Sequence, residues 1–122
     1  MIATEGYISD IVTDSAMTFI ERNKEQPFFA YLPYNTPHTR FIAPEGLYQK
    51  YKAQGLSDEI ASTYGMIENI DNNIGRLLNK LENLNILENT LVIFLTDNGP
   101  NFDRYNATVS YTHLTLPTIC SV

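Results

Sequence analysis

The chain has 122 residues, of which 43% are hydrophobic and 18% charged, and its formal net charge is −6. This composition is typical of a folded domain and not of a disordered segment, and the acidic balance argues against a nucleic-acid partner, which requires a basic patch. No apolar stretch approaches the ~20 residues that span a bilayer, so no membrane contact is predicted. The lone cysteine, Cys120, excludes an internal disulfide framework and a cysteine-cluster metal site.

The first predicted element is a helix from Ser9 to about Asn23. Ser9 and Asp10 are typical of a helix start, with a capping hydroxyl followed by an acid in the first turn. Gln26-Pro27 ends this helix, and residues 28–32 form a continuous apolar run that predicts a buried strand. The apolar positions of the helix recur at helical spacing: Ile8, Val12, Ala16, Phe19 and Ile20.

The strand predicted at residues 28–32 is followed by a proline-rich polar segment, residues 33–39, which contains His38. A lone histidine after a proline is commonly a surface loop residue. Residues 41–55 then form a long connection with a short helical turn at residues 44–48.

The longest predicted helix runs from a Ser57 cap to about Leu84. Glu68 and Asp71 lie largely off its apolar stripe and are predicted to be solvated, and Gly75 suggests close packing against a sheet, since it costs about 1 kcal/mol relative to alanine. The stripe recurs every three or four residues: Ile60, Tyr64, Ile67, Ile70, Ile74, Leu77, Leu81 and Leu84.

A second apolar run, residues 91–95, leads directly into Thr96-Asp97-Asn98-Gly99-Pro100. Strand, helical crossover and strand make a right-handed βαβ unit, so the predicted fold class is α/β with parallel strands. Ligands of such sheets gather at the carboxyl ends of the strands, which predicts that His38, Asp97 and Asn98 share one edge. The oxygen atoms of Asp97 and Asn98 suit a hard cation, although Asp-Asn-Gly is also a common turn sequence.

Three blocks of this sequence together resemble type I sulfatases of the alkaline-phosphatase-like superfamily. Residues 28–38 resemble the sulfatase segment that ends in Pro-His, and residues 67–78 resemble the crossover helix. Residues 89–100 are similar to the strand that delivers metal ligands, and Arg104-Tyr105-Asn106-Ala107 is a plausible continuation in arylsulfatases. The blocks follow the order and spacing of that family over residues from about 6 to 108.

The resemblance implies a partial catalytic domain of a sulfuric ester hydrolase, with an incomplete sheet. It implies that Asp97 and Asn98 are ligands of Ca²⁺, or alternatively Mg²⁺, and that His38 contacts the sulfate and helps to protonate the leaving oxygen. The substrate would be a sulfate ester, either a small molecule or a sulfated glycan. Asn98, in place of a histidine, favours sulfatases over phosphodiester or phosphonate hydrolases of the same superfamily. An exported location, periplasmic or extracellular, is common in that family, and the sequence itself assigns none.

Several parts of the sulfatase pattern are absent from this sequence. The nucleophile motif, Cys or Ser-x-Pro-x-Arg, which supplies the formylglycine, is missing, as are an acidic pair and a later lysine. We therefore expect a fragment, inactive alone, in which residues 1–108 are sulfatase and residues 109–122 are not native. Residues 109–118 resemble one translated frame of a common sequencing-library adapter. The alternative from another class is a small non-catalytic α/β module that binds a partner or cation.

Overall fold

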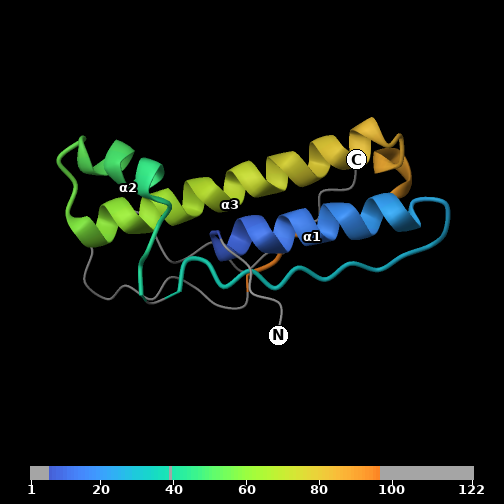
Figure 1. The fold of residues 1–122 in the computed structure, drawn as a ribbon, viewed down its shortest axis with the longest axis horizontal. Coiled ribbons are helices and arrows are strands. Elements are labelled where there is room, and N and C mark those ends of the chain that lie inside the picture. The colour runs from blue at the N-terminus through green and yellow to red at the C-terminus, as the bar shows by residue number, and fades with distance from the viewer. Residues whose placement is uncertain (1–5, 39, 97–122) are drawn as a thin grey trace, which may run out of the picture. The chain divides into compact units, whose positions relative to one another are not determined.

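The structure, a computed structural model, describes residues 6–38 and 40–96. The chain divides into two units, residues 1–87 and residues 88–122, which are described separately. The first contains three α-helices, α1 (Ile8–Asn23), α2 (Glu45–Lys52) and α3 (Asp58–Asn83) (Figure 1). A short 3₁₀ helix, η1 (Leu87–Asn89), follows. None of the described helices is long and apolar enough to cross a membrane.

Both ends of α3 are set by local hydrogen bonds, and the N-terminal one is the predicted Ser57 cap. Ser57 is the N-cap, and its hydroxyl accepts a hydrogen bond from the backbone N–H of Ile60 at 3.4 Å. At the other end, Asn85 has a positive φ of 56°, and the N–H of Ile86 donates to the carbonyl of Leu81 at 3.1 Å. This left-handed stop is the Schellman motif, which satisfies carbonyls that the helix end leaves open. The prediction of a helix to about Leu84 is confirmed.

The start of α1 differs from the prediction. The N-cap is Tyr7, whose side chain makes no capping hydrogen bond, and Ser9 lies inside the first turn. The Ser9 side chain is fully buried and faces the hydroxyl of Thr36 at 3.3 Å. The hydroxyl that predicted a cap is used in a tertiary contact instead.

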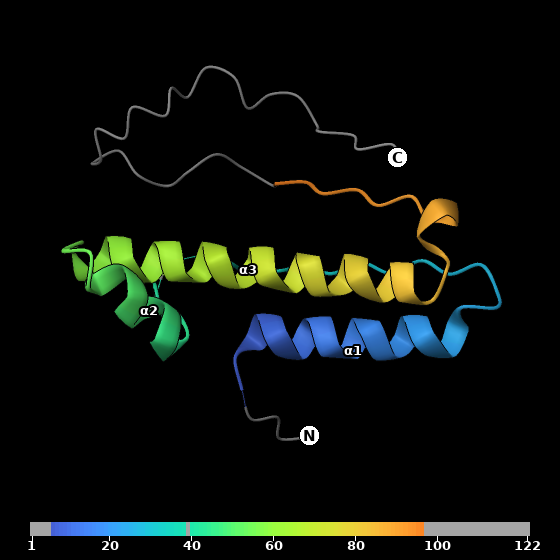
Figure 2. The same ribbon diagram turned by 90° about the horizontal axis from the view of Figure 1, so that it is seen from above.

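α1 and α3 lie side by side and run in the same direction (Figure 2). Three contacts establish this direction, because partners later in α1 meet partners later in α3. Asn69 and Asn73 contact Asp10, and Lys80 contacts Glu21. The two helices are therefore parallel neighbours.

α2 packs on the first half of α3, and Gly65 makes this possible. A Cβ added at Gly65 would lie 2.8 Å from the Cβ of Ala43 and 3.3 Å from that of Leu47. At Gly75, no described residue has an atom within 4 Å of a Cβ built there, and its predicted packing against a sheet stays a prediction. Close packing on α3 therefore occurs where α2 crosses it.

The face that α3 presents to α1 is largely polar. The predicted apolar stripe is mostly half-exposed in the described part of the chain, with Tyr64 and Ile67 each 48% exposed. The buried apolar side chains among the described residues are few: Ile20, Ala61, Met66 and Leu81. Buried polar side chains are more numerous: Ser9, Thr13, Ser62, Thr63, Asn69 and Asn73.

Residues 28–34 run back along α1 in the opposite direction. The ring centroids of Phe19 and Phe28 are 6.2 Å apart in an edge-to-face contact, and the hydroxyls of Thr13 and Tyr34 are 2.6 Å apart. Burial alternates along this segment, as in an extended chain; the side chain of Phe29, for example, is 85% exposed.

Neither predicted strand, residues 28–32 nor residues 91–95, is assigned as a strand in the described part of the chain. A parallel strand is defined by hydrogen bonds to neighbouring strands, and the described residues form no such ladder. Leu91 is 70% exposed and Leu95 65%. The helices are thus confirmed, whereas the parallel sheet stays a prediction.

Candidate functional site

His38 is exposed and ends a turn that α1 holds in place. Its backbone N–H donates to the carbonyl of Asn35 at 3.0 Å, which closes a turn containing a cis Thr36–Pro37 bond. The hydroxyls of Tyr34 and Thr36 reach back to α1, where they contact Thr13 and Ser9 respectively. We call residues 34–38 the exit loop.

The other two predicted site residues, Asp97 and Asn98, lie outside the described residues, so their juxtaposition with His38 stays a prediction. Within residues 6–38 and 40–96, no group of three or more His, Cys, Asp or Glu side chains is arranged to hold a metal ion. The described part of the chain therefore contributes His38 alone to the predicted site.

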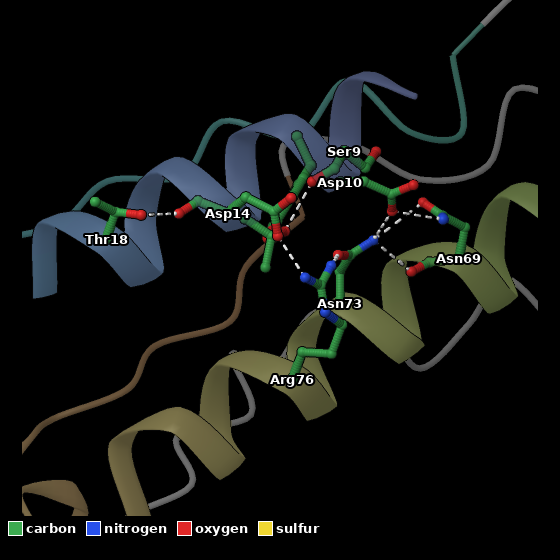
Figure 3. A network of polar contacts seen from close by, with 9 residues as sticks. Ser9, Asp10, Asp14, Thr18, Asn69, Asn73 and Arg76 are labelled. Carbon is green, nitrogen blue, oxygen red and sulfur yellow. Dashed lines mark hydrogen bonds and ion pairs between the residues drawn. The ribbon is translucent and has the colours of Figure 1, made fainter. Parts of the chain in front are cut away.

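A network of polar side chains joins α1 to α3 (Figure 3). The side-chain amides of Asn69 and Asn73 both donate to Oδ1 of Asp10, at 2.9 and 2.6 Å. The Asn73 amide also donates to the carbonyl of Asn69 at 2.9 Å, and its Oδ1 accepts from Nη1 of Arg76 at 2.9 Å. Asn73 is 1% exposed, so every polar atom of its side chain is satisfied where water has little access.

The same network continues along the two helices with ion pairs. Nη2 of Arg76 binds the carboxylate of Asp14, so that one guanidinium bridges Asn73 and Asp14. Further along, Nζ of Lys80 lies 2.8 Å from Oε2 of Glu21. A hydrogen bond from Lys80 lowers the pKa of Glu21 below its ordinary value.

Sequence reasoning missed this network, although the spacing contained a signal for it. Asn69, Asn73 and Arg76 lie at steps of four and three residues, and Asp10 and Asp14 are four apart. Such steps place side chains on one face of a helix. Asparagine is a poor helix former, so a pair of asparagines at this spacing in the middle of a long helix indicates a polar contact.

Two lysines of α2 bind acids of α3, which corrects the prediction for Glu68. Nζ of Lys50 lies 2.6 Å from Oε1 of Glu68, whose side chain is only 23% exposed and not freely solvated. Hydrogen bonds from Lys50 and then Tyr51 lower the pKa of Glu68. Lys52 forms a matching pair with Asp58 and lowers its pKa through a hydrogen bond. Asp71 is exposed, as predicted.

Tyr7 stands at the entry to α1, next to the exit loop. Burial raises the pKa of its phenol above the ordinary 10.0, an effect that a hydrogen bond with Thr36 partly offsets. An open hollow of about 390 Å³ lies further along α1, between that helix and residues 29–32. Its lining is mostly apolar, so it resembles an unfilled packing face more than a site for an anionic ligand.

Comparisons with known proteins place the chain in a class. The family model described as Sulfatase matches residues 2–116, and the chain therefore belongs to the sulfatase family. The chain is 35% identical over 105 residues to the uncharacterized sulfatase YdeN of Escherichia coli (strain K12), a match that covers 84% of this chain and 19% of that protein.

A second relative is the N-acetylgalactosamine-6-O-sulfatase of Bacteroides thetaiotaomicron, with 35% identity over 102 residues, 79% of this chain and 17% of the relative. Among solved structures, the crystal structure of Ps i-CgsB is similar, with a TM-score of 0.73 and 33% identity. That match covers 80% of this chain and 22% of the other. The chain thus spans about a fifth of the length of these proteins.

Proposed function

We propose that this chain is part of a sulfuric ester hydrolase, in which His38 contacts the sulfate and Asp97 and Asn98 bind a divalent cation. The observation that carries the proposal is the sulfatase family match over residues 2–116. The substrate is a sulfate ester, and the N-acetylgalactosamine-6-O-sulfatase among its relatives favours a sulfated glycan.

The chemistry of the proposed residues agrees with this activity. An imidazole donates or accepts a proton near neutral pH, so the exposed ring of His38 suits the leaving oxygen of a sulfate ester. His38 also lies on a loop whose neighbouring residues are tied to α1, and such a tie limits how far a catalytic group can drift.

We further propose that residues 28–32 and 91–95 are parallel strands of one sheet. In α/β folds, the helices of successive crossovers run parallel to one another and opposite to the strands they cover. α1 and α3 are parallel, and residues 28–34 run opposite to α1, which agrees with that topology. His38 and Asp97 would then share the carboxyl edge of the sheet.

The donor set of Asp97 and Asn98 fits Ca²⁺ or Mg²⁺ in kind but not in number. A carboxylate and an amide supply the oxygen ligands that these hard cations prefer, whereas Ca²⁺ takes about 6–8 ligands. These two residues alone do not fill that number, and we propose that other residues of the longer protein, together with water, supply the remaining ligands. A bound cation would offset the negative charge of the sulfate oxygens.

The test compares this chain with the longer protein that supplies the missing motif. The purified chain, assayed with an activated aryl sulfate and added Ca²⁺, is expected to show no turnover, because the covalent step has no nucleophile. In the longer protein, Asp97→Ala is expected to abolish activity together with metal binding. His38→Ala is expected to lower kcat while the metal stays bound.

Asn72→Ala is the control in the longer protein, because Asn72 is exposed on α3 and is not one of the proposed site residues, so activity is expected to be unchanged. Full activity of His38→Ala, or turnover by the isolated chain above a His38→Ala background, would contradict the proposal. Faster hydrolysis of a bis-aryl phosphate than of the aryl sulfate would favour the phosphodiesterase alternative.

A further inference from the structure

A chain of two hydroxyl groups connects the exit loop to the backbone of α1. Oγ1 of Thr13 donates to the carbonyl of Ser9 at 2.7 Å, and the hydroxyl of Tyr34 lies 2.6 Å from the same Oγ1. A threonine hydroxyl carries one proton, which is already committed to Ser9. The Tyr34 hydroxyl must therefore donate to Thr13, and the direction runs from Tyr34 through Thr13 to the Ser9 carbonyl.

A second contact holds the exit loop two residues further on. The side-chain oxygens of Ser9 and Thr36 are 3.3 Å apart, and Ser9 and Thr13 are both completely buried. Tyr34 and Thr36 thus point toward α1, whereas His38 is exposed at the end of the turn. The imidazole of His38 is therefore separated from the two anchored residues, Tyr34 and Thr36, only by the turn that the His38 N–H closes.

α1 is itself fixed, which gives the two contacts a rigid base. Asp10, directly after Ser9, accepts hydrogen bonds from two asparagines of α3. Asp14, directly after Thr13, binds the guanidinium of Arg76. Each hydroxyl that holds the exit loop therefore adjoins a carboxylate that holds α3.

We propose that Thr13 is a positioning residue for His38, because its hydroxyl sets the position of the exit loop on α1. This rests on the proposed function, in which His38 contacts the substrate. A valine of similar size at this position would fill the same space, but it would leave the Tyr34 hydroxyl and the Ser9 carbonyl without their common partner.

Amide hydrogen exchange in the existing chain tests the positioning step without any activity. Thr13→Val is expected to increase the rate of hydrogen exchange at the His38 N–H about tenfold. Loss of one hydrogen bond shifts the equilibrium between the closed and the locally opened exit loop by about that factor, and the amide exchanges from the opened state. Thr13→Ser keeps the hydroxyl and is expected to exchange as the wild type does. Tyr34→Phe removes the other partner of the same hydrogen bond and should increase exchange at His38 as much as Thr13→Val does. Combining the two substitutions should increase the exchange rate little further.

Thr18→Val is the matched control. Thr18 lies on the same helix and donates to the carbonyl of Asp14 at 2.9 Å, but its side chain is exposed and this hydrogen bond stays within α1. This variant is expected to leave exchange at His38 unchanged. Unchanged exchange at His38 in Thr13→Val, or an equal rise at His38 and throughout α3, would overturn the positioning role.

In the longer sulfatase, Thr13→Val is expected to lower kcat about tenfold with little change in KM, and Thr13→Ser is expected to restore it. Full activity of His38→Ala would refute the role of His38 in catalysis, yet the exchange result would stand. Wild-type kcat in Thr13→Val, alongside a defective His38→Ala, would refute the positioning role alone. The two failures are therefore distinguishable.

Discussion

Replacing Asn73 tests whether the polar network holds α1 on α3. Asn73→Ala removes a hydrogen bond to the carboxylate of Asp10 and another from the guanidinium of Arg76. Hydrogen bonds to charged groups contribute about 1.5–3 kcal/mol each. Asp10 keeps its 2.9 Å bond to Asn69 and is not left unpaired, so the expected loss in the free energy of unfolding is about 3 kcal/mol.

The assay is urea unfolding followed by far-UV circular dichroism at neutral pH. With an m value of about 1.5 kcal/mol/M, the midpoint should fall by about 2 M. If the wild-type free energy of unfolding is smaller than the expected loss, the Asn73→Ala variant should show no helical circular dichroism signal even without urea. Asn73→Asp preserves the volume but places a second carboxylate beside Asp10, so we expect a loss at least as large.

Asn72→Ala is the control, because Asn72 is the exposed neighbour on the same helix. Its effect should stay within about 0.5 kcal/mol, the range of uninvolved surface substitutions. If Asn73→Ala were no more destabilising than Asn72→Ala, the network would contribute nothing net to the packing of α1 on α3.

Three further predictions use the same unfolding measurement. Gly65→Ala should lower the free energy of unfolding by about 1–3 kcal/mol, because the added Cβ would overlap Ala43. Gly75→Ala has open space around it and should raise the free energy of unfolding by about 1 kcal/mol. Equal effects of the two substitutions would contradict the close approach at Gly65. A hydrogen bond from Lys50 lowers the pKa of Glu68 in the folded chain. The stability that this pair contributes is present above the ordinary pKa of 4.5 and should be lost as pH falls through the lower pKa of the folded chain. Glu68→Gln should reduce the dependence of the unfolding free energy on pH in that range. The raised pKa of Tyr7 predicts a loss of stability at alkaline pH. Above the ordinary pKa of 10.0 the phenol ionises first in the unfolded chain, so stability falls as pH rises. Tyr7→Phe should make this fall smaller, and the contributions of Tyr48 and Tyr51, whose pKa values are also raised, should remain.

The helices could be predicted from sequence where local signals decide them. Ser57 marks the start of α3 because its hydroxyl caps the backbone within three residues, and within residues 6–38 and 40–96 no distant side chain competes for that hydroxyl. Ser9 carries the same signal, but there a partner from distant sequence, Thr36, takes the hydroxyl. Local propensity cannot reveal which of two identical side chains has such a partner.

The polar network and the close approach at Gly65 could not be read from apolar periodicity. The stripe rule assumes that helices meet through apolar faces, whereas α1 meets α3 through Asp10, Asn69 and Asn73. Of the candidate site, the sequence indicated His38 on a loop after residues 28–32, and the structure agrees. Asp97 and Asn98 lie outside the described residues and stay predictions.

The polar contact between α1 and α3 also determines the rotation of α1 about its own axis. A one-residue slip turns a helix by about 100°, which would carry Asp10 away from both asparagines and Asp14 away from Arg76 in a single step. Apolar faces tolerate a range of neighbouring packings, but hydrogen bonds weaken steeply once their angles are lost. Since Ser9 and Thr13 turn with the same helix, the rotation of α1 that satisfies Asp10 and Asp14 is also the rotation that places both hydroxyls against the exit loop.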